Sequence, residues 1–242
     1  MKYRTILFTA ILAIFAALAA YGQEDNSTMT RQLGKEPENS PAWAAKLGEE
    51  QKAEQIFIIA AYGETTACVS MHEKDETGTW KMIMTTPGFI GQKGLGKIRE
   101  GDRKTPAGIF HFNRAFGIAD DPGCTIPFVK ADDNTYWSGD GRTGKHYNEL
   151  INLCDCPDID TKASEHIVDY QTEYQYAMNI SYNEKGEPGL GSAIFLHCLG
   201  SRKPYTGGCT AIPQDKMIFV FKHVRPECVV VIDSMENLGA SF

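Results

Sequence analysis

The sequence predicts a mainly β domain that carries a few short helices. Residues 55–62 (QIFIIAAY), 66–73 (TACVSMHE) and 79–86 (TWKMIMTT) are short segments rich in apolar and β-branched residues, and glycine-containing turns separate them. Residues 193–198 (AIFLHC) and 228–233 (CVVVID) are continuous apolar runs of the length typical of buried strands. Together these segments favour an α+β class in which strands dominate.

The N-terminus has the layout of a secretory signal peptide over residues 1–22. Lys2 and Arg4 precede an apolar stretch, and small residues lead up to Gln23. This predicts an exported protein of the periplasm or cell wall. The alternative is an uncleaved N-terminal membrane anchor, although the apolar stretch is shorter than the about 20 residues that a spanning helix needs.

A polar segment follows the signal over residues 23–53 and predicts a flexible tether. Within it, residues 41–52 are compatible with a short helix. The predicted domain then covers residues 54–234, and residues 235–242 form a C-terminal tail. A chain of this size is long enough to bury one substantial core.

The middle of the domain alternates between loops and short elements. Gly91, Gly94 and Gly96 indicate irregular loop backbone. A phosphate-binding loop is not expected, because its glycines lie between a strand and a helix and end in a Gly-Lys-Ser/Thr step, and neither condition is met here. Residues 101–110 (GDRKTPAGIF) predict a turn that leads into a strand, and we expect Asp102 and Thr105 to fix this turn by local hydrogen bonds. Residues 120–160 predict a long loop.

The last third of the domain completes the predicted elements. Residues 164–175 favour a short helix, and a strand is expected near residues 178–182. Pro213 stands at a favoured helix-entry position, and the spacing of Met217, Phe221 and Val224 predicts a helix with one apolar face.

Charge and cysteine content exclude several function classes. Without Lys2 and Arg4, the 24 basic residues fall to 22 against 31 acidic ones, and no basic cluster is present, so nucleic-acid binding is not expected. The seven cysteines form no CxxC pair, which argues against a zinc site. In an exported chain an odd count leaves at least one free thiol, and export into a reducing setting would leave all of them free. We expect no metal and no cofactor.

His197 and Cys209 are the candidate catalytic residues. His197 ends a predicted strand, where its imidazole is held rigidly, and Cys209 follows the pair Gly207-Gly208. A cysteine nucleophile needs a base to form the thiolate, and its acyl intermediate needs N–H donors aimed at the oxyanion. Glycines let successive N–H groups converge. On residue types alone, the alternative is a tight turn beside a structural thiol.

Cys198 is adjacent to His197 and points to the opposite face of the strand in this prediction, so we expect it in the core and not in the site.

The motifs GDRKTPAGIF and IFLHC...YTGGCTAIP resemble the catalytic domain of the L,D-transpeptidases (YkuD type), whose pattern is Gly-Asp-x-x-Thr-Pro-x-Gly followed by a histidine and then Ser/Thr-x-Gly-Cys. The resemblance implies a β-sandwich with a few short helices. It also implies Cys209 as the acylated nucleophile and His197 as its base, with the N–H groups of Gly208 and Cys209 holding the oxyanion. Thr206 matches the Ser/Thr position.

The family attacks the peptide bond after the diamino acid at the third position of peptidoglycan stem peptides, releases D-alanine and passes the acyl group to an amine. The resemblance therefore implies stem peptides as partners, a carbapenem adduct at Cys209, and no cofactor; we expect a monomer. One alternative is a hydrolytic L,D-carboxypeptidase with the same dyad, and another is an inactive wall-binding domain of the same fold.

Two departures from the family pattern concern substrate binding. Gly207 stands where many members have histidine, and Thr210-Ala211 stand where an arginine or asparagine is usual. Arg202 is a candidate for binding the substrate carboxylate, because a guanidinium pairs with carboxylate in bidentate fashion. Tyr147 and Trp137, in the long loop, are candidates for the wall of a donor groove.

Overall fold

The computed structural model describes residues 37–200 and 203–240. The expected signal peptide, residues 23–36 of the expected tether, and Arg202 lie outside the described residues. One compact unit begins at Asn39. None of the helices in the described part of the chain has the length and apolar character needed to cross a bilayer.

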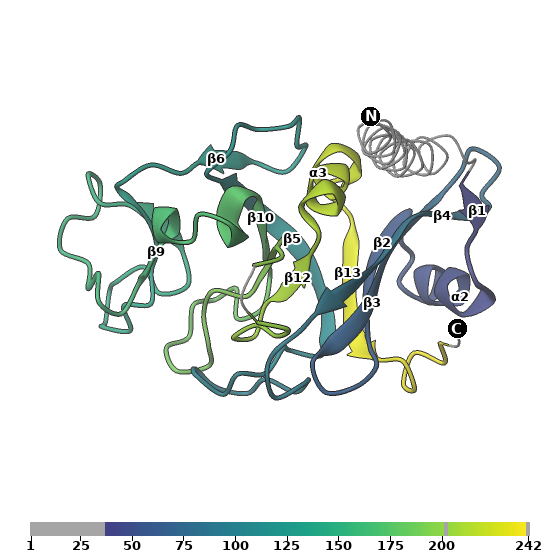
Figure 1. Ribbon diagram of the computed structural model, residues 1–242, viewed down its shortest axis with the longest axis horizontal. Helices are drawn as coiled ribbons and strands as arrows, with labels where there is room; N and C mark the ends of the chain where they lie inside the picture. The colour runs from purple at the N-terminus through teal and green to yellow at the C-terminus, as the bar shows by residue number, and fades with distance from the viewer. Residues whose placement is uncertain (1–36, 201–202, 241–242) are drawn as a thin grey trace, which may run out of the picture. The chain divides into compact units, whose positions relative to one another are not determined.

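In the described residues, ten strands form one strongly curled sheet (Figure 1). Along it the order is β4-β12-β11-β10-β5-β13-β2-β3, and β3 also pairs with β4, so the sheet closes on itself. The predicted mainly β fold with few helices is confirmed. The strands are β1 (Glu38–Asn39), β2 (Gln55–Ala61), β3 (Thr66–Lys74), β4 (Trp80–Phe89), β5 (Gly108–Gly117), β6 (Phe128–Lys130), β10 (Ala177–Ile180), β11 (Phe195–Cys198), β12 (Thr210–Ile212) and β13 (Val229–Ser234).

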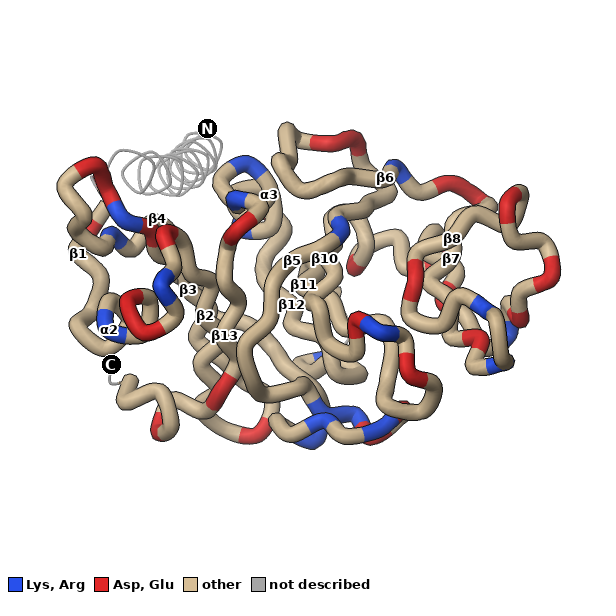
Figure 2. The backbone as a smooth tube through the Cα atoms, turned by 180° about the vertical axis from the view of Figure 1, so that it is seen from behind, with Lys and Arg blue, Asp and Glu red and all other residues tan. Residues whose placement is uncertain are grey.

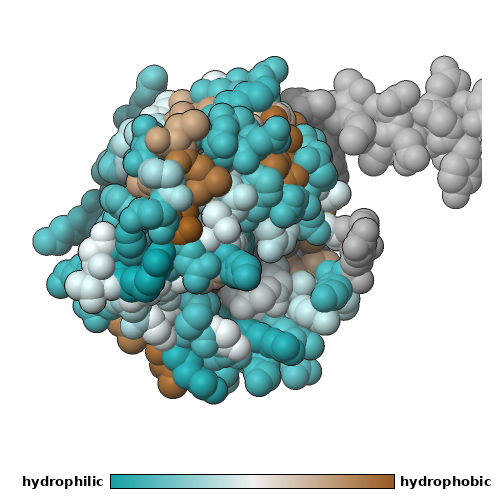
Figure 3. All heavy atoms as spheres, turned by 90° about the vertical axis from the view of Figure 1, so that its left-hand side faces the viewer, coloured by the Kyte–Doolittle hydropathy of each residue, from teal (hydrophilic) through white to brown (hydrophobic). Residues whose placement is uncertain are grey.

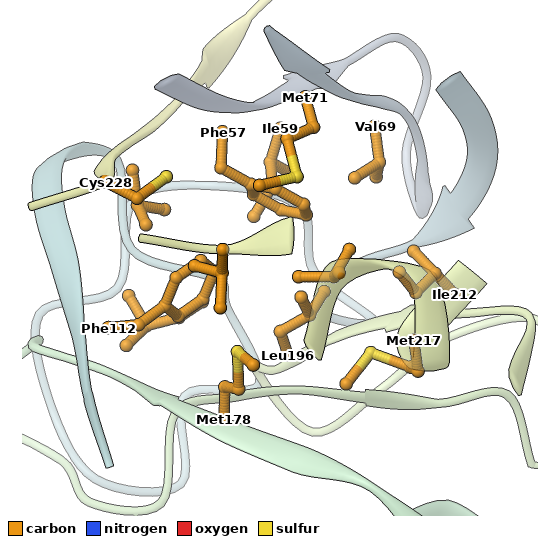
Figure 4. Packing of buried hydrophobic residues seen from close by; sticks show 14 of the residues in the cluster. Phe57, Ile59, Val69, Met71, Phe112, Met178, Leu196, Ile212, Met217 and Cys228 are labelled. Atoms are coloured by element: carbon orange, nitrogen blue, oxygen red, sulfur yellow. The ribbon is translucent and has the colours of Figure 1, made fainter. Parts of the chain in front are cut away.

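The main core lies inside this curled sheet. Strand β2 is buried at every position, since it lies between β3 and the parallel strand β13. Figure 4 shows side chains from opposite parts of the sheet pointing toward one another, among them Phe57, Leu196 and Ile212. The helix α3 (Gln214–His223) contributes Met217 to the same cluster, as its apolar spacing predicted. Burial of these side chains supplies most of the stabilisation of the domain.

An insertion between β5 and β10 builds a second, smaller sheet of order β8-β7-β9, seen at the left of Figure 1. Its strands are β7 (Thr135–Trp137), β8 (Leu150–Asn152) and β9 (Glu165–His166). Figure 3, which views this end of the molecule, shows mainly hydrophilic residues with hydrophobic ones in separate groups.

The short helix expected over residues 164–175 is not formed. The segment holds β9 and two 3-10 turns, η1 (Ile167–Asp169) and η2 (Glu173–Gln175). Two contacts explain the difference: Glu165 pairs with Trp137 in the small sheet, and the backbone at Tyr174 is non-helical because its side chain is buried between the sheets.

The end of the expected tether belongs to the compact unit. Residues Ala42–Glu50 form the helix α2, and its buried residues Ala44 and Gly48 lie against the domain. Ala44 and Trp80 share an apolar cluster with Ile56, and the indole Nε1 of Trp80 donates to Glu49 at 2.8 Å. The polar composition of this segment predicted a flexible tether, but one apolar face of α2 is enough to pack the helix against the domain. Met235 and Leu238 of the expected tail pack on the same cluster.

The contact between α2 and Trp80 generates a stability prediction. A Cβ at Gly48 would lie 2.3 Å from the Trp80 ring. Gly48→Ala would stabilise a solvent-exposed helix by about 1 kcal/mol, but here we expect a loss of about 1 to 3 kcal/mol from overpacking. Urea unfolding of the chain measures it.

The matched control is Gly48→Ala in a Trp80→Leu background, where the smaller side chain makes room and the penalty disappears. An unchanged or higher stability for Gly48→Ala alone would show that α2 does not dock as described.

Candidate active site

The parallel pairing of β11 with β12 brings the two candidate catalytic residues to one face of the sheet. Leu196 pairs with Thr210 and His197 with Ala211. Side chains alternate along a strand, so His197 and Cys209 face one side while Leu196 faces the other. The predicted position of Cys198 is confirmed: it is 1% exposed and lies in the main core.

The Cys209 thiol is largely buried and lines a cleft. Sγ accepts from the N–H of Phe195 at 3.3 Å and donates to the carbonyl of Ala193 at 3.2 Å. Burial raises the pKa of the Cys209 thiol to about 12, and the Glu165 carboxylate acts in the same direction. At rest the sulfur is therefore protonated and points to the backbone before β11.

The imidazole of His197 is held in one orientation. Nδ1 hydrogen-bonds to the carbonyl of Cys198 at 2.8 Å, and since a carbonyl only accepts, Nδ1 carries the proton. The Tyr174 ring packs edge-on against the imidazole at 5.6 Å. Burial lowers the pKa of His197, so the ring is neutral and its Nε2 has a free lone pair. This is the state that a general base requires.

The turn before Cys209 is fixed by Thr206. Its Oγ1 donates to the carbonyl of Cys209 at 2.6 Å and accepts from the N–H of Gly208 at 3.1 Å. Gly208 has a φ of 149° and its missing Cβ would lie 2.9 Å from the Lys104 carbonyl, so only glycine fits. The N–H of Gly208, expected as an oxyanion donor, is engaged inside the turn. A Cβ at Gly207 would meet no atom within 4 Å, which leaves this position open.

Thr105 from the first motif reaches across to the catalytic turn. Its Oγ1 accepts from the N–H of Gly91 at 2.8 Å and lies 2.8 Å from the carbonyl of Gly208 and 3.2 Å from that of Cys209. The sequence suggested only a local role for Thr105 in its own turn. The structure instead makes it the link between two motifs about a hundred residues apart.

Asp102 does have the expected local role. It accepts from the N–H groups of Ile98, Arg99 and Lys104 and pairs with the buried Lys97 at 3.1 Å. Burial alone would raise the pKa of Asp102, but these donors lower it to about 2. The carboxylate therefore stays ionised and holds the loop that carries Thr105.

The cleft above Cys209 has a volume of about 610 Å³. The loop between β4 and β5 supplies basic residues to one wall, and blue segments gather at the lower edge of Figure 2 where this loop lies. The insertion supplies acidic residues to another wall. The charged and polar residues of the lining are Gln92, Lys97, Glu100, Arg103, Glu165, Tyr170, Glu173, Tyr174, Ser192, His197, Lys203, Tyr205, Thr206 and Cys209.

Trp137 and Tyr147, expected in the groove wall, are not in the cleft. Trp137 is 3% exposed, packs edge-on against Phe195 and donates from Nε1 to Asn148 at 3.0 Å. Tyr147 is 6% exposed and donates to Glu100 at 2.6 Å. Trp137 therefore packs between the insertion and the main sheet, Tyr147 is anchored to the β4–β5 loop, and the polar atom of each ring has a partner. Thr206 and Gly207 do line the cleft.

Asn148 is a site residue that the sequence did not indicate. Its Oδ1 accepts from the N–H of Ala193 at 3.0 Å as well as from Trp137. Ala193 has a φ of 55°, which costs free energy for a residue with a Cβ, and its carbonyl is the acceptor of the Cys209 thiol. Asn148 thus stabilises the backbone that holds the sulfur.

Glu165 and Tyr174 were also missed, although both line the cleft. They lie in a segment with irregular structure, where no periodicity assigns a face. Within the described residues, no group of three or more potential ligands could hold a metal ion.

Thr105 gives a prediction on reactivity. Thr105→Val keeps the shape of the side chain but removes its hydroxyl, which leaves two carbonyls and one N–H without this partner. The lost hydrogen bonds should cost about 1 to 3 kcal/mol in the positioning of the turn. We therefore expect the acylation rate of Cys209 to fall by about 10- to 100-fold. Thr105→Ser keeps the hydroxyl and should restore most of the rate. Rates for both variants are measured with a carbapenem under pre-steady-state conditions, and equal losses in Val and Ser would exclude the hydroxyl's role.

The raised pKa of the thiol predicts how alkylation depends on pH. With a pKa of about 12, the thiolate is a fraction on the order of 10⁻⁵ at pH 7, so the rate at Cys209 should rise about tenfold per pH unit up to at least pH 10. Iodoacetamide labelling followed by peptide mapping measures it. The urea-unfolded chain is the control, whose rate levels off above about pH 8.5. A plateau near neutral pH in the folded chain would instead indicate a thiolate paired with a charged His197.

Comparison with known proteins places this geometry in a family. No protein of curated function matches the chain. Two solved structures are similar to it at low identity: "the Ldtfm-avibactam carbamoyl enzyme" (15% identity, TM-score 0.35, 75% of this chain and 49% of that one) and L,D-transpeptidase 1 of Mycobacterium tuberculosis (13% identity, TM-score 0.32, 75% and 62%). The chain thus spans about half of the first chain and about three fifths of the second.

The family model described as the L,D-transpeptidase catalytic domain (YkuD) matches residues 61–232, which is most of the chain. The matched range contains both motifs, the strands from β3 to β12 with most of β13, and the cleft with Cys209 and His197. The chain belongs to the L,D-transpeptidase catalytic domain family.

Proposed function

We propose that this chain is an exported, cysteine-dependent L,D-transpeptidase that acts on peptidoglycan stem peptides through an acyl-thioester. The observation that supports it best is that His197, on β11, and Cys209, the residue directly before the parallel strand β12, both line one cleft. The neutral imidazole offers a free Nε2 to the thiol, and the family membership supplies the reaction class.

The first half of the reaction forms the thioester. The Cys209 thiol leaves the Ala193 carbonyl, passes its proton to Nε2 of His197, and the sulfur attacks the carbonyl of the donor peptide. The N–H of Gly208 is engaged by Thr206. We therefore assign the oxyanion to the N–H groups of its two neighbours, Gly207 and Cys209. His197 then returns the proton to the leaving D-alanine amine.

Substrate carboxylates are assigned to the basic wall of the cleft. Arg103 and Lys203 line it, and the guanidinium of Arg103 is oriented by a 2.9 Å hydrogen bond to Gln92. This pair takes the place of the arginine that the family pattern puts after the cysteine and that Thr210-Ala211 lack here. The sequence candidate Arg202 adjoins Lys203 in the chain.

The second half transfers the acyl group from sulfur to an amine, which yields a cross-link or an attached amine. Water as acceptor would give the carboxypeptidase reaction instead. An exported location is consistent with a wall substrate and with the N-terminal signal layout.

The proposal is tested by covalent labelling and by product analysis. Intact-mass spectrometry after incubation with a carbapenem should show one adduct on the wild type and none on Cys209→Ala. With a tetrapeptide stem donor, a dimeric stem peptide is the expected product, and His197→Gln should lower its rate by about 100-fold or more.

An adduct that persists in Cys209→Ala, or no adduct in the wild type, would exclude the catalytic assignment and favour an inactive wall-binding domain. Tripeptide as the sole product would establish hydrolysis instead of transfer.

A further inference from the structure

Glu165 lines the cleft, and in the described part of the chain it has no cationic partner. It comes from β9 of the insertion, and its carboxylate accepts a 2.6 Å hydrogen bond from the hydroxyl of Tyr174. Among the ion pairs formed within residues 37–200 and 203–240, none involves Glu165. Burial raises the pKa of the Glu165 carboxyl, although the Tyr174 hydrogen bond opposes this rise. A half-buried carboxylate without a cation is costly to keep.

The surroundings of Glu165 increase the negative potential. Glu100 from the β4–β5 loop acts on the Glu165 carboxyl and raises its pKa. Glu165 in turn raises the pKa values of Tyr170, Tyr174 and Cys209. Glu173 lines the same cleft. This wall is therefore an electrostatic site for a positive charge.

The position of Glu165 does not suit activation of the cysteine. A negative charge near the sulfur disfavours the thiolate, as the raised pKa of Cys209 shows. The carboxylate thus makes the first half of the reaction harder. The second half has a different requirement, because an amine acceptor arrives as an ammonium ion and must lose one proton before it has a lone pair to attack with.

We propose that Glu165 binds the ammonium group of the acyl acceptor and takes this first proton. The inference rests on the proposed function, since it concerns the acceptor step of the same site. It makes Glu165 a catalytic and specificity-determining residue, and the substrate class that it selects is a primary amine.

Protons and bonds balance in this step. The ammonium R–NH₃⁺ gives one proton to the Glu165 carboxylate and becomes R–NH₂. The nitrogen attacks the thioester carbonyl, the C–N bond forms and the C–S bond breaks. The second proton leaves the nitrogen to Nε2 of His197, which passes it to the departing Cys209 thiolate. Glu165 then loses its proton to solvent through the open cleft, and the enzyme is restored.

The geometry assigns Glu165 to the acceptor and not to the donor. Tyr174 connects the two groups involved, since its hydroxyl donates to Glu165 and its ring packs 5.6 Å from the ring of His197. Glu165 and His197 thus contact the same tyrosine, which places an amine held at Glu165 on the side of the cleft where the imidazole can take its second proton. The donor carboxylates are assigned to the basic residues Arg103 and Lys203.

The test measures the ratio of transfer to hydrolysis. Glu165→Gln keeps the size of the side chain but removes its charge and its ability to take a proton. With a tetrapeptide donor and a stem-peptide amine as acceptor, we expect the ratio to fall by about 100-fold, while acylation by a carbapenem stays equal or becomes faster. Hydroxylamine is a nucleophile that is uncharged at neutral pH, so transfer to it should be unchanged in Glu165→Gln.

The matched control is Glu184→Gln, which removes an exposed carboxylate that pairs with His111 outside the cleft. The ratio of transfer to hydrolysis should stay at its wild-type value in this variant, with the stem-peptide amine and with hydroxylamine. An unchanged ratio with the stem-peptide amine, or an equal loss with hydroxylamine, would overturn the role of Glu165 while leaving the proposed function intact. Failure of the wild type to form any Cys209 adduct would overturn both.

Discussion

The parallel pairing of β11 with β12 is the constraint on which the site depends. Two parallel neighbouring strands usually need a connection of about 12 or more residues. Here residues 199–209 alone connect β11 to β12. The chain therefore has to turn tightly before Cys209, and Gly208, with its φ of 149°, allows it. The same register buries Leu196 and Ile212 in the main core. A shift by one residue would exchange the core and cleft faces and remove His197 from the cleft.

A tight turn is not rigid by itself, and its order comes from elsewhere in the chain. Thr105 bonds the carbonyls of the turn, and Asp102 with the buried Lys97 fixes the loop from which Thr105 extends. A buried carboxylate with three N–H donors and a cation has its hydrogen-bonding needs met, which is the condition for burying charge without loss of stability. The two motifs occur together in the sequence because the first one holds the second in place.

Sequence predicted the regular parts of the fold and site well and the insertion poorly. Alternation along β11 correctly placed Cys198 in the core, and the 3.6-residue spacing predicted α3, because periodicity assigns a face in regular elements. Trp137 was wrongly expected in the cleft. In irregular backbone no periodicity shows where a side chain points, so its position depends on its contacts, and Trp137 bonds to the buried Asn148. Glu165 was missed for the same reason. The assignment of Arg202 to a carboxylate stays a prediction.

The insertion controls the site through two independent contacts. Asn148 holds Ala193 in its strained conformation, and Ala193 fixes the protonated sulfur, so the insertion sets the resting position of the nucleophile. Glu165 sets the charge beside it and disfavours the thiolate until a cation enters. A neutral, buried thiol reacts slowly with small electrophiles from solvent. A bound ammonium would offset the charge of Glu165 and so favour the thiolate of Cys209. An amine in the cleft would therefore make the cysteine more reactive when an acceptor for transfer is present.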